Sequence, residues 1–340
     1  MTTRMLNWFM SSETSWFAPI IKLCKGENPK DQINTIFKTV GVPVIAFMIF
    51  LVLWSASASR VQTSLGQVPG PVAVMEQAQN LLAEHRAERQ KAADFYERQR
   101  IRNEAKLAKD PQAEVKWRTY NGRPTYMDQI WTSLYTVFSG FLLASLLAIP
   151  LGIVCGLNQT TYSALDPLIQ IFKPVSPLAW LPIVTMVVSA VYVSDDPMFP
   201  KSFVNSAITV TLCCLWPTLI NTAVGVANID KDLINVSRVL RLSWFAQLRK
   251  IVLPAAIPMM FTGLRLSLGV GWMVLIAAEM LAQNPGLGKF VWDEFQNGSS
   301  NSLGRIMVAV LTIGFIGFLL DRLMLSLQRA VSWDKSSASR

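Results

Sequence analysis

The chain has 340 residues, of which 51% are hydrophobic and only 16% are charged. Soluble domains carry about 25% charged residues, so this composition excludes an ordinary soluble domain and indicates a membrane protein. The formal net charge of +9 could suggest a nucleic-acid-binding protein, but no basic face outside the membrane segments supports that function.

Six windows of the sequence are apolar enough to cross a membrane, which takes roughly 20 apolar residues. Their hydrophobic runs are continuous rather than alternating, which predicts helices and argues against a closed barrel. We therefore expect an all-α, polytopic membrane protein with six transmembrane helices. The windows span about 41–59, 131–157, 168–193, 203–228, 257–282 and 306–328.

The basic residues predict that both termini are cytoplasmic. With this topology the short inner segments hold thirteen Lys and Arg residues, and the short outer loops hold only Lys201 and Lys289, in agreement with the positive-inside rule. The first span ends in small residues that a signal peptidase accepts, but about 40 residues precede it, more than in a signal peptide. We expect a retained span in the bacterial inner membrane; cleavage would leave five spans and an outer N-terminus.

The chain is expected to divide into five segments around these spans. In the first of them, residues 6–25 form either an interfacial helix or a loosely ordered tail. The segments are a cytoplasmic N-terminal segment at 1–38, the first transmembrane helix at 39–59, a periplasmic loop at 60–128, a five-helix core at 129–328 that includes a cytoplasmic loop at 229–256, and a cytoplasmic tail at 329–340.

The periplasmic loop contains a strongly charged stretch at 84–116, with neither Gly nor Pro before Pro111. Opposite charges at helical spacing, such as Asp94 and Arg98, predict a solvated helix. The stretch has too few apolar residues to build its own core, so it either docks on a partner or has no binding role. The single histidine, His85, should be solvated.

The later spans contain small residues, prolines and a few polar groups. Gly152 and Gly156 are spaced for close helix approach, and the repeated prolines of the third span predict kinks. Polar and ionisable groups inside spans usually face a cavity or a partner. The candidates for a translocation path are Lys173, Asn221, Arg265 and Trp272.

Most of these candidates have a plain structural alternative. Lys173 can extend to the inner membrane surface, Arg265 can pair with another span or likewise extend inward, and Trp272 can belong to the packing of the bundle. Glu279, near the outer end of the fifth span, is expected to be structural. The four cysteines have neither a plausible disulfide partner nor metal-ligand spacing.

The segment 229–256 is a basic, amphipathic loop between two apolar runs. Its apolar residues recur at helical spacing, Pro254 interrupts the pattern, and Pro258 suits the first turn of the next span. We expect two short helices at the inner surface, joined near 241–243. Such a water-facing loop is best explained as a contact surface for a partner on the same side of the membrane.

This loop resembles the coupling loop of ABC-importer permeases, E-A-A-x-x-x-G followed by nine residues and I-x-L-P. Asn235, Val236 and Ser237 stand at the E-A-A positions, Arg241 at the glycine, and Ile251, Leu253 and Pro254 at I-x-L-P, with the basic Arg238 between them. The missing Glu puts in doubt the ion pair that it would form with the ATPase. Arg241 in place of glycine predicts either that no left-handed turn forms there or that the helix break is shifted.

Further motifs resemble the nitrate/sulfonate/taurine/bicarbonate branch of these permeases. The similarity covers about 60–75 and 128–328, whereas 76–127 falls outside it. Within the branch, 292–295 and 320–324 are most similar to nitrate-type permeases. The motifs of the branch lie at 66–71, 166–170, 177–182, 263–265, 277–280 and 286–288.

The resemblance implies a type I ABC-importer permease bundle in membrane lipid, with a second permease subunit, most simply an identical copy. A periplasmic binding protein would deliver the substrate, and the coupling loop would sit in a groove of a separate ATPase. The chain lacks the phosphate-binding motif GxxxxGK[ST], so it is expected to bind no cofactor and to be no enzyme, with ATP and Mg used by the partner.

A small oxyanion is the expected substrate: nitrate or nitrite first, then taurine or another sulfonate, cyanate or bicarbonate. Two other classes of function remain open. An autonomous channel or ion-coupled carrier would transport without an ATPase, and a membrane scaffold would use the 84–116 helix. The coupling loop is explained by neither of these.

Overall fold

The computed structural model describes residues 34–63, 66–110, 114–193 and 197–331. The chain forms two compact units, Met1–Met75 and Glu76–Arg340. In the first unit, the π-helix η1 (Phe37–Gly41) leads into α4 (Val42–Ala58). The apolar side chains of α4 are exposed on all sides, as expected of a helix that lies in lipid. The predicted interfacial segment at 6–25 lies outside the described residues.

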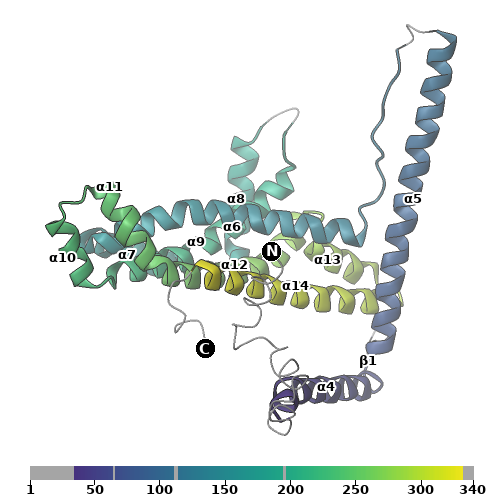
Figure 1. The fold of residues 1–340 in the computed structure, drawn as a ribbon. Helices are drawn as coiled ribbons and strands as arrows, with labels where there is room; N and C mark the ends of the chain where they lie inside the picture. The colour runs from purple at the N-terminus through teal and green to yellow at the C-terminus, as the bar shows by residue number, and fades with distance from the viewer. Residues whose placement is uncertain (1–33, 64–65, 111–113, 194–196, 332–340) are drawn as a thin grey trace, which may run out of the picture. The chain divides into compact units, whose positions relative to one another are not determined.

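The secondary structure of the described residues is helical apart from one short strand pair in the first unit. Strands β1 (Gln62–Thr63) and β2 (Gly66–Gln67) are antiparallel, with Gln62 opposite Gln67. The expectation of an all-α membrane protein is confirmed. Figure 1 shows the remaining elements, which are α5 (Pro71–Lys109), α6 (Tyr126–Leu157), α7 (Gln159–Phe172), α8 (Pro177–Val191), α9 (Lys201–Ala227), α10 (Lys231–Val239), α11 (Trp244–Gln247), η2 (Leu248–Val252), α12 (Leu253–Ala282), α13 (Leu287–Asn297) and α14 (Ser302–Val331).

Five helices within the described residues are long and apolar enough to cross a membrane, and a sixth crossing results if α7 and α8 are taken together. The expectation of one span at 168–193 is wrong in detail, because α7 and α8 are bent by 100° at the break between them. Pro174 lies within this break, and Pro177 is the first residue of α8. Proline lacks the backbone N–H that would continue the helical hydrogen bonds, and it disfavours a helical residue before it.

The core of the bundle is the contact of α9 with α6 and α12, and glycines bring these helices together. A Cβ atom at Gly152 of α6 would lie 2.7 Å from the Cβ of Thr222 on α9. A Cβ at Gly271 of α12 would lie 2.5 Å from the sulfur of Cys214. A side chain at either glycine would push the helices apart, so the predicted close approach at small residues is confirmed.

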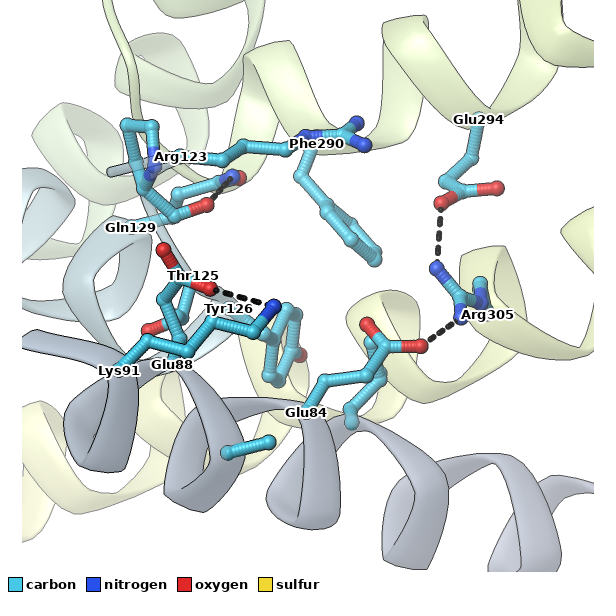
Figure 2. A pocket seen from close by; sticks show the side chains of 13 residues that line it. Glu84, Glu88, Lys91, Arg123, Thr125, Tyr126, Gln129, Phe290, Glu294 and Arg305 are labelled. Carbon is cyan, nitrogen blue, oxygen red and sulfur yellow. Dashed lines mark hydrogen bonds and ion pairs between the residues drawn. The ribbon is translucent and has the colours of Figure 1, made fainter. Parts of the chain in front are cut away.

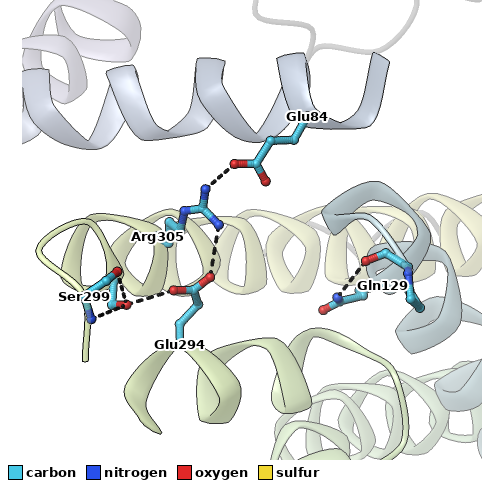
Figure 3. Close-up of polar contacts among 7 residues, drawn as sticks. Glu84, Gln129, Glu294, Ser299 and Arg305 are labelled. Carbon is cyan, nitrogen blue, oxygen red and sulfur yellow. Dashed lines mark hydrogen bonds and ion pairs between the residues drawn. The ribbon is translucent and has the colours of Figure 1, made fainter. Parts of the chain in front are cut away.

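One group of contacts between the helix α5 and the bundle is centred on an arginine. Arg305 of α14 forms ion pairs with Glu84 of α5 and, at 3.2 Å, with Glu294 of α13 (Figure 3). Ser302 at the start of α14 donates a hydrogen bond to the same Glu294 at 2.9 Å. Three elements are therefore connected through a single polar cluster.

A second group of contacts connects α5 to the beginning of α6. Arg89 pairs with Asp128, and Nδ1 of His85 lies 2.7 Å from the hydroxyl oxygen of Thr125. The expectation that His85 is solvated is therefore wrong. Between these contacts lies a cavity of about 230 Å³ (Figure 2), whose lining includes three basic and three acidic side chains. Because the charges are balanced, we assign no anion site to it.

The segment after α5 returns along the helix in an extended conformation. Gln99 accepts a hydrogen bond from the backbone N–H of Arg118 at 3.1 Å and donates one to its carbonyl oxygen at 3.3 Å. The hydroxyl of Tyr120 donates to Glu88 at 2.7 Å; this bond lowers the pKa of the carboxyl group and raises the pKa of the tyrosine. The observed helix begins at Pro71 and ends at Lys109, so both of its ends lie earlier in the chain than in the predicted 84–116. The earlier C-terminal end is explained by Pro111 in the sequence, because proline does not continue a helix.

Candidate functional site: the cytoplasmic loop and the polar groups at membrane depth

The loop predicted to contact a partner lies beyond one end of the bundle. In Figure 1, α10 and α11 stand at this end, and α13 lies at the opposite end. The two helices are separated at 240–243, where Ser243 caps α11 by accepting a hydrogen bond from the N–H of Ala246 at 3.3 Å. This arrangement agrees with the predicted pair of short helices.

The turn between α10 and α11 contains a residue in a left-handed conformation. Arg241 has a φ of 46°, in the region that glycine adopts readily and other residues do so at a cost. Neither alternative drawn from the arginine is therefore correct, because the left-handed turn forms at the position where the family motif has glycine. The backbone geometry is kept although the residue is different.

Arg241→Gly should raise the free energy of local unfolding of the loop by about 1 kcal/mol, because glycine adopts the left-handed conformation without strain. Arg241→Ala is the matched control, since it also removes the charge but keeps a Cβ in the same conformation. We expect hydrogen exchange of the amides at 239–243 to slow in the Gly variant and not in the Ala variant. Equal exchange in the two variants would show that the backbone conformation is not strained.

The second helix of the loop is continuous with the span that follows. Trp244–Ala282 forms one helix of 39 residues, with the π-helical turn η2 inside it. The expectation that Pro254 breaks the pattern before this span is wrong. Pro254 is the second residue of α12, which comes directly after η2, so it lies inside the continuous helix, as does Pro258, which was expected in the first turn of the span.

The continuous helix is fixed to the bundle just above the loop. Val252 is almost completely buried against Ile153 of α6, Val226 of α9, and Ala256 and Met260 of α12. A closely packed apolar cluster resists deformation. We therefore expect a displacement of α11 to be transmitted to α12 rather than absorbed at the join.

The tip of the loop exposes an unusual amount of apolar surface. The side chains of Val239, Trp244 and Phe245 are 81%, 66% and 65% exposed, and those of Val236 and Leu240 are also exposed. A contiguous exposed apolar patch of this kind marks a protein–protein or a membrane interaction site. We call these five residues the tip patch. The sequence did not indicate Val239 and Trp244, because no sequence pattern shows that a single apolar residue is exposed.

The other residues of the family motif are divided between the surface and the interior. Asn235, Arg241 and Pro254 are exposed, whereas Ile251 and Leu253 are partly buried. Ser237 is 1% exposed, and its hydroxyl donates to the carbonyl oxygen of Ile234 at 2.6 Å. Arg238 belongs to α10, but its side chain lies outside the described part of the structure.

The candidates for a translocation path do not form one site. Lys173 is exposed at the bend between α7 and α8. Trp272 is buried, and its indole N–H donates to the carbonyl oxygen of Ile313 at 2.9 Å. Asn221 donates to the carbonyl oxygen of Pro217 on its own helix at 2.8 Å. These two side chains therefore already have backbone partners.

Arg265, the remaining candidate, forms an ion pair with a neighbouring span. Its Nε and Nη2 atoms lie 2.5 and 3.0 Å from the two carboxylate oxygens of Asp321 on α14. Both side chains are 38% exposed. The pairing with another span, foreseen as an alternative, is therefore found, and the two-bond geometry gives it a fixed orientation.

A completely buried carboxylate organises the end of the bundle at which α13 begins. The Glu279 side chain accepts a hydrogen bond from the N–H of Gly288 at 3.0 Å, and Ser133 of α6 lies 2.8 and 2.9 Å from its two oxygens. The same hydroxyl oxygen accepts a bond from the N–H of Leu287 at 2.8 Å. Glu279 thus fixes the glycine-containing turn before α13 against α6, which agrees with the structural role expected for it.

Residues 148–333 match the family described as "Binding-protein-dependent transport system inner membrane component". The chain is 38% identical over 208 residues to "Nitrate import permease protein NrtB" of Leptolyngbya laminosa, a match that covers 60% of this chain and 70% of the relative. It is 34% identical over 289 residues to "Bicarbonate transport system permease protein CmpB" of Synechococcus elongatus, which covers 85% of this chain and 88% of the relative.

The chain is also similar to a more distant relative and to a solved structure. A "Putative aliphatic sulfonates transport permease protein SsuC" of Bacillus subtilis is 31% identical over 205 residues, covering 60% of this chain and 69% of the relative. Among solved structures, an inward-facing "MetNI methionine ABC transporter" chain superimposes with a TM-score of 0.52 at 15% identity. That match covers 61% of this chain and 95% of the other, and it shows a shared fold.

Proposed function

Because the chain belongs to the family of binding-protein-dependent transport system inner membrane components, we propose that it imports a small oxyanion, nitrate or nitrite first, with energy from a separate ATPase. The chain is an ABC-importer permease of the nitrate, bicarbonate and sulfonate type. Nitrate is favoured by the motifs at 292–295 and 320–324, and bicarbonate is the alternative, since its relatives are similarly close.

The tip patch is the observation on which the proposal depends. Its apolar side chains are exposed, and the patch is continuous with a membrane-spanning helix through α11 and η2. An ATPase that binds this patch and changes shape would displace α12 with it. The chain needs no nucleotide site of its own for this mechanism, because ATP and Mg are bound by the ATPase.

The proposed assembly has further parts. We expect a second copy of the permease beside the first, membrane lipid around both, and a periplasmic binding protein on the outer side at α13. Both termini lie in the cytoplasm in this arrangement. Taurine, other sulfonates and cyanate are less favoured substrates, since the nitrate-type motifs do not point to them.

The test is uptake by proteoliposomes that contain the permease with or without its ATPase. With ATPase, binding protein and ATP, we expect nitrate uptake that excess bicarbonate inhibits weakly. Without the ATPase we expect no uptake above that of empty liposomes. Uptake by the permease alone would support an autonomous channel or carrier instead, and strong inhibition by bicarbonate would reverse the order of substrates.

A further inference from the structure

The pair of Arg265 and Asp321 lies deep within two spanning helices. At 1.5 Å per residue, Arg265 is about 18 Å from the beginning of α12 at Leu253 and about 26 Å from its end. Asp321 is about 28 Å from the beginning of α14 and about 15 Å from its end. Both charges therefore lie at least about 15 Å from the nearest end of their helices.

An open helix face adjoins the ion pair. On α12, Leu266, Gly269 and Met273 follow one another along the helix and are exposed. No heavy atom of the described chain lies within 4 Å of the place that a Cβ would occupy at Gly269. The guanidinium and the carboxylate are therefore partly accessible from a face that this protomer does not cover.

Lipid is an unfavourable neighbour for such a face. Ionisable groups within spans usually face protein or a water-filled cavity, because hydrocarbon solvates charge poorly. A pair that was only structural would be better protected between α12 and α14 than at 38% exposure of each side chain. The exposed side of the pair is therefore expected to face protein, water or a hydrophilic solute in the assembled transporter.

We infer that Arg265 is an oxyanion-binding residue of the translocation path and that Asp321 is the counter-ion which the substrate displaces. This inference rests on the proposed function and gives it a site. A guanidinium binds two oxygens attached to one central atom through parallel N–H groups. Nitrate, bicarbonate and sulfonates all present such a pair of oxygens. The Asp321 carboxylate, which binds the guanidinium of Arg265 in the structure, presents the same pair.

The counter-ion has a clear physical role in this mechanism. A bare guanidinium at membrane depth would hold an anion too tightly, whereas transport requires a site from which the ion can also leave. Return of Asp321 to Arg265 would release the substrate without leaving an unpaired charge. Chloride is a single spherical ion and cannot accept the two parallel N–H bonds of the guanidinium on separate oxygens, so it should compete poorly.

The experiment uses the complete complex of permease, ATPase and binding protein, with two readouts. One is the increase in Tm as nitrate or bicarbonate replaces chloride at constant ionic strength, because binding to the folded state raises Tm. The other is the rate of uptake. The variants are Asp321→Asn, Arg265→Lys and Arg265→Gln; Arg322→Gln is the control, since Arg322 neighbours Asp321 and lies over the ring of Phe318 instead.

We expect Asp321→Asn to lower the half-saturating oxyanion concentration in the Tm titration about tenfold and to slow uptake. Arg265→Lys should keep the Tm measured in chloride and lose the preference for oxyanions, because lysine has no planar fork. Arg265→Gln should lose both the oxyanion response and uptake. Arg322→Gln should respond as the unmodified complex does.

Two results would overturn the inference. One is that Asp321→Asn and Arg265→Gln lower Tm in chloride while their oxyanion titrations stay as in the unmodified complex; the pair would then be purely structural. The other is an unchanged preference in Arg265→Lys. Both results can occur while the unmodified complex still imports nitrate, and they would then contradict only the binding site. The proposed function itself would fail if a correctly assembled, unmodified complex imported no oxyanion.

Discussion

Replacing Trp244 and Phe245 together by glutamate should abolish ATP-driven uptake while the protein still inserts and folds. The two side chains are among the most exposed apolar groups of the tip patch. Aromatic residues at the centre of an interface contribute about 2 kcal/mol or more each, so the double variant should bind the ATPase at least about 100-fold more weakly. The measurement is co-purification of the ATPase, together with uptake.

The control for this prediction is the variant Trp244→Phe with Phe245→Leu, which keeps the patch apolar. We expect it to retain most ATPase binding. Both variants should have the Tm of the unmodified permease when no partner is present, since neither side chain is part of the core. Full ATPase binding by the glutamate variant would mean that the partner contacts another surface.

Glu279→Ala should be among the most destabilising single changes in the bundle. It leaves the N–H of Gly288 and the hydroxyl of Ser133 without their acceptor, at about 1–3 kcal/mol for each buried group. It also removes the buried atoms that fill the space beside Gly286. The total loss should be about 4 kcal/mol, measured as a lower Tm in detergent and a smaller yield of folded protein.

Glu279→Gln separates shape from charge at this position. The amide fills the same space and keeps an oxygen that can accept one of the hydrogen bonds, so we expect a loss of only about 1 kcal/mol. If the Ala and Gln variants have the same Tm, the hydrogen bonds of Glu279 do not hold the turn before α13 as described.

The composition and the continuous apolar runs were sufficient to predict the bundle, because a lipid-embedded backbone has few ways to satisfy its own hydrogen bonds. The break between α7 and α8 was only partly predictable. The prolines indicated kinks, but the 100° bend depends on tertiary packing. Pro254 was misjudged for a related reason: the helix continues through it, directly after the π-helical turn η2.

The site was predicted less completely than the fold. The loop motif identified the right segment, yet Arg241 concealed the left-handed turn that its backbone still adopts. The sequence suggested that Arg265 either faced a path or paired with another span. The structure shows the pair with Asp321 and also its exposure, which no sequence pattern reports because it depends on which helices are neighbours.

The most direct test of the coupling mechanism is chemical labelling of the tip patch. A cysteine at Ser237 would react slowly because that residue is buried, whereas Val239 is well exposed. In a variant without the native cysteines, Val239→Cys should react with a membrane-impermeant maleimide from the cytoplasmic side only, and the ATPase should protect it. Reaction from the periplasmic side, or reaction that the ATPase does not change, would contradict the account.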